Sequence, residues 1–372
     1  MDLIGPATVV SVAYVDPGNF GANIASGASY GLDLLWVVWL SGALAIMYQY
    51  IAGALGLETG KGLLHHLKAR AAWAWPFYIP ALFAVALATD LAEFVGLVVA
   101  LELLFGLPLY AAVALGSIDV LLILALGERR RRYYAAVGAL ASLVGLSFLV
   151  ELALIKPDLS AVLYHSFVPT LGGGEALYAA SIVGATIMPH ALIVHSHLAE
   201  GMDKRTHKAQ TLYNLGLASA VNAAMQITAA YALYGRGDIC ISDVPKILTP
   251  LYGPLAGFAF SIGLLSSGLA SSAVSVQAGA LILEAALGRR VSKYKARSLF
   301  RLANVIPTAA VLALGVSPLA LLVYTQVVLS MILPMVLMPL VLFASRFLDR
   351  RLTAAAYAAS FAVIIINLLA LV

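Results

Sequence analysis

Long apolar stretches separated by short polar segments run along the whole chain. Eleven of these stretches are long enough to cross about 30 Å of hydrocarbon as helices, at roughly 1.5 Å per residue. The pattern therefore predicts an all-α integral membrane protein with eleven transmembrane helices. The predicted helices cover residues 3–29, 33–57, 76–105, 108–127, 133–155, 176–199, 210–234, 251–287, 299–315, 318–345 and 352–372.

The composition excludes a soluble globular domain, because 62% of the residues are hydrophobic, only 11% are charged and the mean hydropathy is +0.96. Asp2 stands where a cleaved signal peptide would have basic residues, and Pro17 and Gly18 interrupt the first apolar stretch. We therefore predict a retained helix there. The single cysteine, Cys240, excludes a disulfide within the chain and a cysteine cluster.

The net charge of +4 is explained by membrane topology rather than by nucleic-acid binding. With the N-terminus in the cytoplasm and the C-terminus outside, the outer connections carry three basic residues: Lys156, Arg236 and Lys246. Eighteen others fall in cytoplasmic connections, as the positive-inside rule predicts, and Arg301 lies just inside the ninth helix. The eighteen are Lys61, Lys68, Arg70, Arg129, Arg130, Arg131, Arg132, Lys204, Arg205, Lys208, Arg289, Arg290, Lys293, Lys295, Arg297, Arg346, Arg350 and Arg351.

Residues 1–372 are predicted to form one transmembrane domain built from two similar halves. The longest connection with turn composition, from Lys156 to Gly174, separates five predicted helices from the next five. Because five is odd, the second half would cross the membrane in the opposite sense. This predicts inverted repeats at about 1–155 and 176–345, with an extra helix at 352–372.

The first helix of each half is predicted to break near its middle, at "VDPGN" and at "IMPHA". Pro17 and Pro189 lack the N–H that would bond the carbonyl four residues earlier, and each disfavours helical geometry in the preceding residue, Asp16 or Met188. Gly18 lets the first segment unwind further. Paired interruptions of this kind point to a transporter binding site, with two unrelated proline kinks as the alternative.

Each break would expose oxygen atoms near the centre of the bilayer. The carbonyls of Ala13 and Ala185 lose their helical partners, and Asn19 adds an amide oxygen beside the Asp16 carboxylate. With the Met188 thioether, these groups form a candidate cation site. Oxygen alone would suit Mg²⁺ or Ca²⁺, whereas sulfur favours Mn²⁺ or Fe²⁺, and zinc and copper usually recruit several imidazoles or thiolates. The alternative is that Met188 only packs within the membrane.

Asp90 and Glu93 are spaced to share one face of the third helix, where two close carboxylates are not both expected to be charged without a partner. One of them is expected to hold a proton; the alternative, which is compatible with this, is a structural pair neutralised by an arginine. His190 is able to titrate, or to stay neutral and bonded to a carbonyl. The other histidines of interest, His65, His66, His195 and His197, are expected to be solvated.

These residues resemble the Nramp family, proton-coupled divalent-metal symporters with a LeuT-like fold. The likeness covers nearly the whole chain, and the motifs at the two breaks are specific as a pair. The motifs are "GPA" at Gly5, "DPGNF" at Asp16, "ATDLAEFVG" at Ala88, "GATIMPH" at Gly184, "HS" at His195, "GLLSSGLASS" at Gly263 and "TQVVLSMILPMVLMPL" at Thr325.

The resemblance implies that the metal is bound by Asp16, Asn19, Met188 and the carbonyls of Ala13 and Ala185, and in some states by Gln326. It also implies proton handling by His190, Asp90 and Glu93, with Arg297 or Arg301 beside that path. Ala191 departs from the family, which usually has asparagine there, and this leaves the fine selectivity open.

The leading hypothesis is a proton-coupled importer of Mn²⁺ or Fe²⁺, and also of Co²⁺ or Cd²⁺, in a prokaryotic plasma membrane. It would work with metal ions, protons and the lipid bilayer, without a permanently bound cofactor, a nucleic acid or an obligate protein partner. One alternative is a sodium-coupled transporter of an organic solute on the same fold, and another is a Mg²⁺-selective relative. A membrane metalloenzyme would need several histidine or carboxylate ligands, so an enzyme is not predicted.

Overall fold

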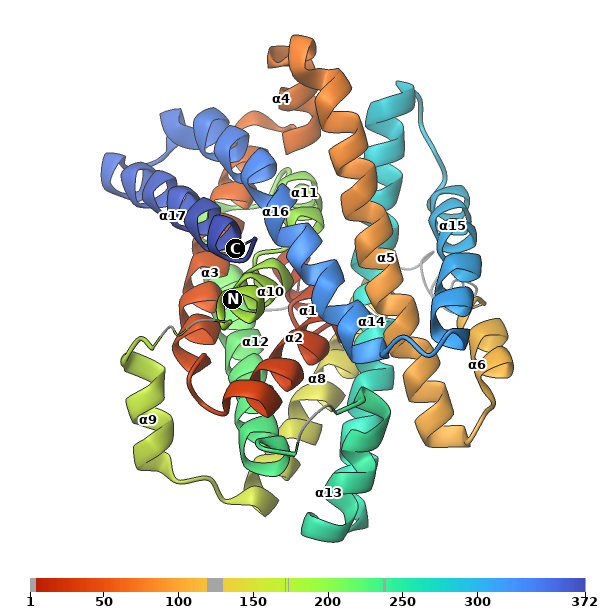
Figure 1. The fold of residues 1–372 in the computed structure, drawn as a ribbon. Helices are drawn as coiled ribbons and strands as arrows, with labels where there is room; N and C mark the ends of the chain where they lie inside the picture. Colours follow the sequence, from red (N-terminus) through yellow and green to blue (C-terminus); the bar gives the residue numbers. More distant parts are fainter. Residues whose placement is uncertain (1–4, 119–129, 171, 173, 237–238, 372) are drawn as a thin grey trace.

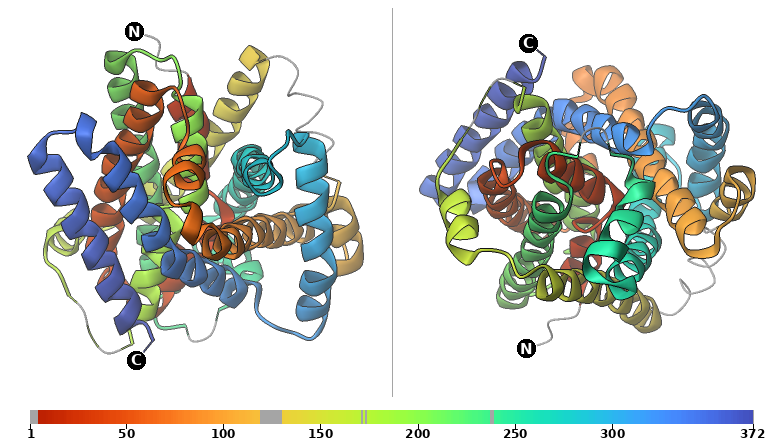
Figure 2. Two further views of the ribbon diagram at one scale, coloured as in Figure 1. Left: turned by 90° about the horizontal axis from the view of Figure 1, so that it is seen from above. Right: turned by 60° about the horizontal axis from the view of Figure 1, so that its bottom comes forward.

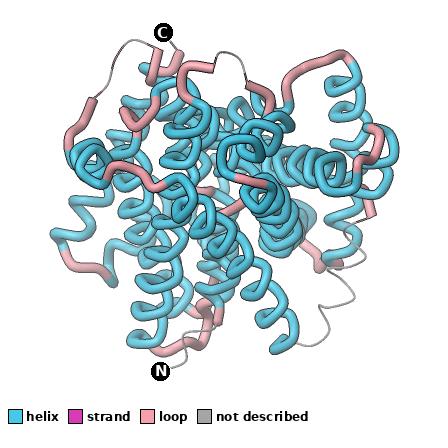
Figure 3. Tube along the Cα trace, turned by 90° about the horizontal axis from the view of Figure 1, so that it is seen from below, coloured by secondary structure: helices cyan, strands magenta, loops and turns pink. Residues whose placement is uncertain are grey.

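The computed structural model describes residues 5–118, 130–170, 172, 174–236 and 239–371, and no strand occurs in these ranges (Figures 1 and 3). The all-α prediction is confirmed for this part of the chain. The helices are α1 (Pro6–Ala13), α2 (Pro17–Tyr30), α3 (Leu35–Thr59), α4 (Leu63–Arg70), α5 (Trp75–Phe105), α6 (Leu109–Gly116), α8 (Arg130–Ile155), α9 (Leu159–Phe167), α10 (Ala176–Thr186), α11 (Pro189–Leu198), α12 (Lys204–Leu233), α13 (Val244–Tyr252), α14 (Pro254–Leu287), α15 (Lys293–Ala313), α16 (Pro318–Ala344) and α17 (Arg350–Leu369).

Several helices are long and apolar enough to span a membrane. Within the described ranges, seven segments meet both conditions by length and composition. The predicted helix 3–29 is divided into α1 and α2. Residues 119–127 of the predicted helix 108–127 lie outside the described ranges, and so do residues 3–4, 129 and 372. The seven segments are Leu35–Thr59, Ala72–Phe105, Gly138–Ile155, Ala176–Leu198, Pro254–Leu287, Pro318–Phe347 and Arg350–Leu369.

The two interrupted segments lie at the centre of the molecule. All residues from 9 to 27 and from 179 to 196 are buried. Helix α2 packs against α12 and α16, and α1 against α12 and α14, while α10 packs against α16 and α11 against α3, so longer helices surround both breaks (Figure 2). The outer helices instead expose apolar side chains, such as Ile306 of α15 and Phe361 of α17, as expected for surfaces that face lipid.

Three short helices, α4, α9 and α13, lie wholly or mainly in the connections between the predicted spans. Each has eight or nine residues, too few to cross a bilayer, which is why a search for spans passes over them. Local signals do account for them. Asp158, for example, caps α9 by accepting a hydrogen bond from the Ser160 N–H at 2.9 Å.

The prediction that His66 is solvated is wrong. Its side chain is buried beside α3, where Nε2 lies 3.0 Å from the hydroxyl oxygen of Thr59. This burial lowers the pKa of its imidazole. The neighbouring His65 is exposed, as expected. Two adjacent residues of α4 thus point in opposite directions, which a uniform loop assignment does not anticipate.

Candidate metal site

The first break separates α1 from α2 at Tyr14, Val15 and Asp16. Asp16 caps α2: its Oδ1 accepts a hydrogen bond from the backbone N–H of Asn19 at 2.8 Å. The freed backbone is held by neighbouring helices. The Tyr14 carbonyl accepts a hydrogen bond from Asn222 Nδ2 at 2.8 Å, and the Val15 carbonyl accepts one from the Ser267 hydroxyl at 2.5 Å. The interruption predicted from Pro17 is confirmed.

The second break separates α10 from α11 at Ile187 and Met188. Met188 has an extended backbone, with φ −71° and ψ 120°, and Pro189 begins the next helix. The Met188 side chain is fully buried. The interruption predicted from Pro189 is confirmed by this extended backbone between the two helices. Non-helical backbone at this depth requires polar partners within the protein or a cavity, because lipid offers none.

The side chain of Asn19 joins the two breaks. Its Nδ2 donates a hydrogen bond to the Ala185 carbonyl at 2.7 Å, and it lies 3.1 Å from Asp16 Oδ1. Its Oδ1 accepts a longer hydrogen bond from the Thr186 hydroxyl, at 3.3 Å. A carboxylate, an amide and a carbonyl from segments 166 residues apart thus meet at one point. The structure therefore brings Asp16, Asn19 and the Ala185 carbonyl together, three of the predicted ligands.

Gln326 of α16 reaches the same point. A Cβ placed on Gly18 would overlap the Gln326 amide nitrogen and would lie 2.9 Å from Asp16 Oδ2, so both side chains crowd this glycine. The Gln326 side chain is fully buried, and its Oε1 has no hydrogen-bond partner within the described chain. An unpaired buried amide oxygen costs free energy unless a cation or water meets it. Gln326 therefore adds an oxygen to the candidate ligands.

The donor set suits a transition metal of intermediate softness. It combines carboxylate, amide and carbonyl oxygens, and the buried Met188, at the second break, would add a thioether. In the described residues, no group of three or more His, Cys, Asp and Glu side chains is arranged to hold a metal. A search based on those four residue types therefore misses a site built from amides, carbonyls and sulfur.

Asp90 and Glu93 of α5 face two arginines of α15. Arg297 Nη1 lies 2.6 Å from Asp90 Oδ1 and 3.1 Å from Glu93 Oε2, and Arg301 Nη2 lies 3.4 Å from Asp90 Oδ1. All four side chains are at most 2% exposed. Both candidate arginines therefore contact Asp90, so the carboxylates have the arginine partner that was one of the two alternatives. The assignment of Arg297 to a connection between helices is wrong, because this residue lies within α15 and is buried. Because the cluster holds two carboxylates and two arginines, removing one member would leave a net buried charge, which is strongly destabilising.

Hydroxyl and amide groups complete this cluster. The Ser275 hydroxyl of α14 donates a hydrogen bond to Glu93 Oε2 at 2.6 Å, and Asn304 of α15 donates one to Asp90 Oδ2 at 2.9 Å. Sequence reasoning did not select either residue. The available signal was weak, because Ser275 is one of several serines in α14 and Asn304 lies on a helix with many polar residues.

Helix α5 connects the cluster to the breaks. Thr89, next to Asp90, lies 3.2 Å from His190 Nδ1, where His190 follows Pro189 in the second break. The His190 side chain is buried and bonded to a hydroxyl rather than to a carbonyl. One turn beyond Glu93, Gly96 leaves room for the ring of Pro17.

The prediction that His195 is wet is wrong. The residue is fully buried, and its Nδ1 lies 2.7 Å from Gln49 Oε1 of α3. Gln49 Nε2 in turn donates a hydrogen bond to the Tyr14 hydroxyl at 2.6 Å, in the first break. A glutamine in the middle of an apolar helix was the available signal, because such a residue usually has a buried partner. His197, in the last turn of α11, is exposed as expected.

Comparison with known proteins decides the family. The model of the Nramp family, described as natural resistance-associated macrophage protein-like, matches residues 7–372. The chain belongs to the Nramp family. Nramp proteins similar to it include the divalent metal cation transporter MntH of Deinococcus radiodurans, 36% identical over 367 residues, which cover 93% of this chain and 82% of that protein. MntH of Caldanaerobacter subterraneus is 37% identical, covering 92% and 84%.

Solved structures agree with this assignment. The manganese transporter of Eremococcus coleocola, in complex with an aromatic bis-isothiourea substituted compound, is 25% identical and superposes with a TM-score of 0.86, covering 99% of this chain and 85% of that one. MhsT, in complex with L-phenylalanine, is 16% identical and has a TM-score of 0.65 over 100% and 99%. The second likeness shows a shared LeuT-like fold alone. The Nramp relatives are metal transporters, not enzymes.

Proposed function

We propose that this Nramp protein is a secondary transporter that imports Mn²⁺ or Fe²⁺ together with protons by alternating access. The observation that carries the proposal is the meeting of both helix breaks at Asn19, which contacts Asp16 and the Ala185 carbonyl. The ligands would be Asp16, Asn19, Met188, the carbonyls of Ala13 and Ala185, and Gln326. The names of its relatives, a divalent metal cation transporter and a manganese transporter, support the same choice.

The proposed architecture is one domain of eleven spans. Two inverted halves, at about 1–155 and 176–345, would each begin with a broken helix, and 352–372 would be an extra span. The N-terminus would be cytoplasmic and the C-terminus outside. The position of the breaks in the first helix of each half supports this arrangement, because breaks at Pro17 and Pro189 would serve as both ligand and hinge.

The mixed oxygen and sulfur ligands favour Mn²⁺ and Fe²⁺, and they extend to Co²⁺ and Cd²⁺. A Mg²⁺-selective relative is less well supported, since Mg²⁺ gains little from a thioether. A sodium-coupled transporter of an organic solute would need an open cavity between the breaks. Asp16 and Asn19 fill that space here with a carboxylate and an amide, both buried.

The proposed proton route leads from the breaks through His190 to Asp90, Glu93, Arg297 and Arg301. Its support is that Thr89 and Asp90, adjacent on α5, contact His190 and Arg297 respectively. Coupling is tested by measuring Mn²⁺ uptake into proteoliposomes at several external pH values while tracking internal pH. Internal acidification should accompany uptake and increase at acidic external pH. Uptake without acidification would contradict proton coupling.

The metal site itself is tested by Asp16→Asn. The side-chain oxygen of asparagine can still cap α2, so the variant should fold, but the negative charge that offsets desolvation of the ion is lost. Mn²⁺ uptake should fall by at least about 100-fold, which corresponds to roughly 3 kcal/mol. Asp33→Asn, in a half-exposed connection, is the matched control and should transport normally. Undiminished uptake by Asp16→Asn would refute the site.

A further inference from the structure

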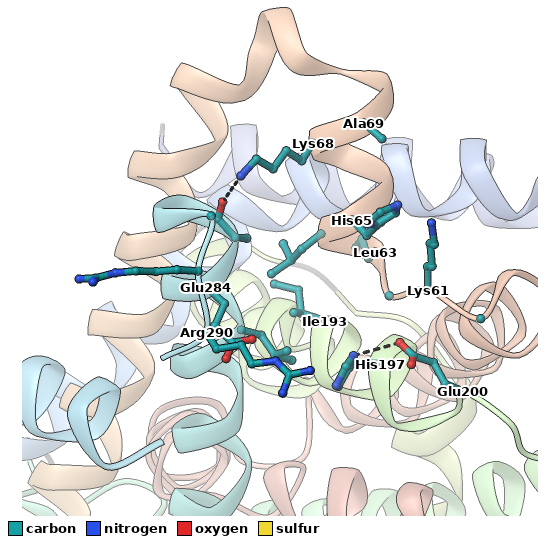
Figure 4. Close-up of a pocket in the computed structure, with 17 residues that line it drawn as sticks. Lys61, Leu63, His65, Lys68, Ala69, Ile193, His197, Glu200, Glu284 and Arg290 are labelled. Atoms are coloured by element: carbon teal, nitrogen blue, oxygen red, sulfur yellow. Dashed lines mark hydrogen bonds and ion pairs between the residues drawn. The ribbon is translucent and has the colours of Figure 1, made fainter. Parts of the chain in front are cut away.

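A basic pocket lies away from the metal site, between α4, α11 and the C-terminal end of α14 (Figure 4). Its volume is about 550 Å³. Four cationic side chains line it: Lys61, Lys68, Arg289 and Arg290. All four are exposed, so their charges are available to a ligand from solvent or from the membrane surface.

The carboxylates of the pocket are already engaged. Glu200 pairs with His197 at 3.0 Å, and Glu284 Oε1 accepts a hydrogen bond from the backbone N–H of Val291 at 3.0 Å. Lys68 donates one hydrogen bond, to the Ala285 carbonyl at 2.9 Å, and an ammonium group has two more to give. The lining therefore carries four cations against two engaged anions, and it would repel Mn²⁺ or Fe²⁺ rather than conduct it.

The pocket also has an apolar wall and aromatic neighbours. Ile193 and Leu281 lie among its lining residues. Just beyond α4, Trp73 is 82% exposed and Phe77 is 70% exposed, while Lys68 lies over the ring of Trp75. Exposed aromatic side chains beside lysine are typical of the boundary between lipid headgroups and acyl chains. The first turn of α4, which also lines the pocket, favours negative charge.

We propose that this pocket binds a phosphate group, carried by the headgroup of an anionic phospholipid or present as free phosphate. Arginine forks and lysine ammonium groups match phosphate oxygens, and basic pockets between helices at the cytoplasmic face suit anionic headgroups. This proposal rests on the proposed membrane orientation only in placing the pocket at the cytoplasmic leaflet. Because Ile193 and His197 belong to α11, the ligand would hold this hinge helix against α4 and α14.

The test uses the full chain purified in detergent and its thermal unfolding midpoint, so it does not depend on transport. Phosphatidylglycerol, phosphatidylcholine and inorganic phosphate are titrated separately. Phosphatidylglycerol should raise the midpoint and phosphatidylcholine should not. If inorganic phosphate alone protects, the pocket takes free phosphate. If none of the three protects, or if phosphatidylcholine protects as well as phosphatidylglycerol, the proposal is overturned.

Variants of the lining residues test whether phosphatidylglycerol binds in this pocket. The double variant Arg289→Gln, Arg290→Gln should bind phosphatidylglycerol about 25-fold more weakly, since each basic side chain near an anionic headgroup contributes roughly fivefold. The matched control is Arg350→Gln, Arg351→Gln, another exposed pair of consecutive arginines outside the pocket, which should bind normally. Equal weakening in both pairs would mean general surface attraction and would overturn the site. Lys61→Gln gives an independent single-residue check and should weaken binding about fivefold.

Discussion

At the scale of residues, most of the proposed ligands are amide, carbonyl and thioether groups rather than histidine or cysteine side chains. The Asn19 amide donates a hydrogen bond to the Ala185 carbonyl at the second break and lies within hydrogen-bond distance of Asp16 at the first. The buried side-chain oxygen of Gln326 has no hydrogen-bond partner in the described chain. Asp16 supplies the only formal charge among the proposed ligands. The selectivity of such a site therefore depends on neutral groups, and Met188 is the one that separates soft from hard ions.

Met188→Leu tests this dependence, because leucine keeps the apolar volume and removes the sulfur. Mn²⁺ uptake should remain partly active, with competition by Ca²⁺ or Mg²⁺ strengthened about tenfold, measured as the concentration that halves Mn²⁺ uptake. Met225→Leu, at a fully buried methionine of α12, is the control and should leave competition unchanged. If Met188→Leu leaves Ca²⁺ inhibition as it is in the original chain, the thioether has no role in selectivity.

At the scale of elements, helices approach one another closely where small residues allow it. Gly184 of α10 packs against the backbone of Gln326 in α16, and Gly96 of α5 packs against Pro17. These contacts fix the breaks relative to the helices that carry Gln326 and the Asp90 cluster. Close approach through small residues is a common basis of helix packing in membranes. The distance between α10 and α16 therefore decides where the Gln326 side chain lies.

Gly184→Ala tests this packing. The added methyl group would overlap the backbone carbonyl of Gln326, which cannot rotate away, so α10 and α16 must separate. Unfolding in detergent should become easier by about 1–3 kcal/mol, and Mn²⁺ uptake should fall with it. Gly216→Ala on α12 meets no atom within 4 Å and should be neutral or more stable by about 0.5–1 kcal/mol. Equal stability of the two variants would show that the contact is unimportant.

At the scale of the whole molecule, buried polar groups lie inside a shell of apolar helices. The Asp90 cluster and the broken segments are enclosed, while α15 and α17 present apolar side chains outward. Four exposed basic residues, Lys61, Lys68, Arg289 and Arg290, lie together at the pocket between α4, α11 and the C-terminal end of α14. This distribution supports a fixed orientation in the membrane.

Orientation is tested with single cysteines in a Cys240→Ser background, since the chain has only one cysteine. Lys246→Cys should react with a membrane-impermeant maleimide in intact cells, because its connection is proposed to be outside. Lys208→Cys, exposed at the start of α12, should react only after permeabilisation. The reverse result would invert the proposed topology, and labelling of both positions in intact cells would contradict the number of spans between them.

The sequence anticipated the local features and missed those that depend on neighbours. Pro17 and Pro189 act within their own segments, so both breaks could be predicted. Ser275 and Asn304 belong to the Asp90 cluster only because α14 and α15 pack against α5. For the same reason His66 and His195 were expected in water but have buried partners, Thr59 and Gln49.

By itself, the sequence determined that the chain is helical, that it suits a membrane and that two prolines deprive carbonyl oxygens of their helical partners, because these properties follow from short-range chemistry. Only the tertiary structure decided which oxygens meet. The contact of Asn19 with Ala185, the crowding of Gly18 by Gln326 and the pairing of Asp90 with two arginines join segments far apart in the chain. Such contacts depend on how the helices pack, which no local pattern specifies.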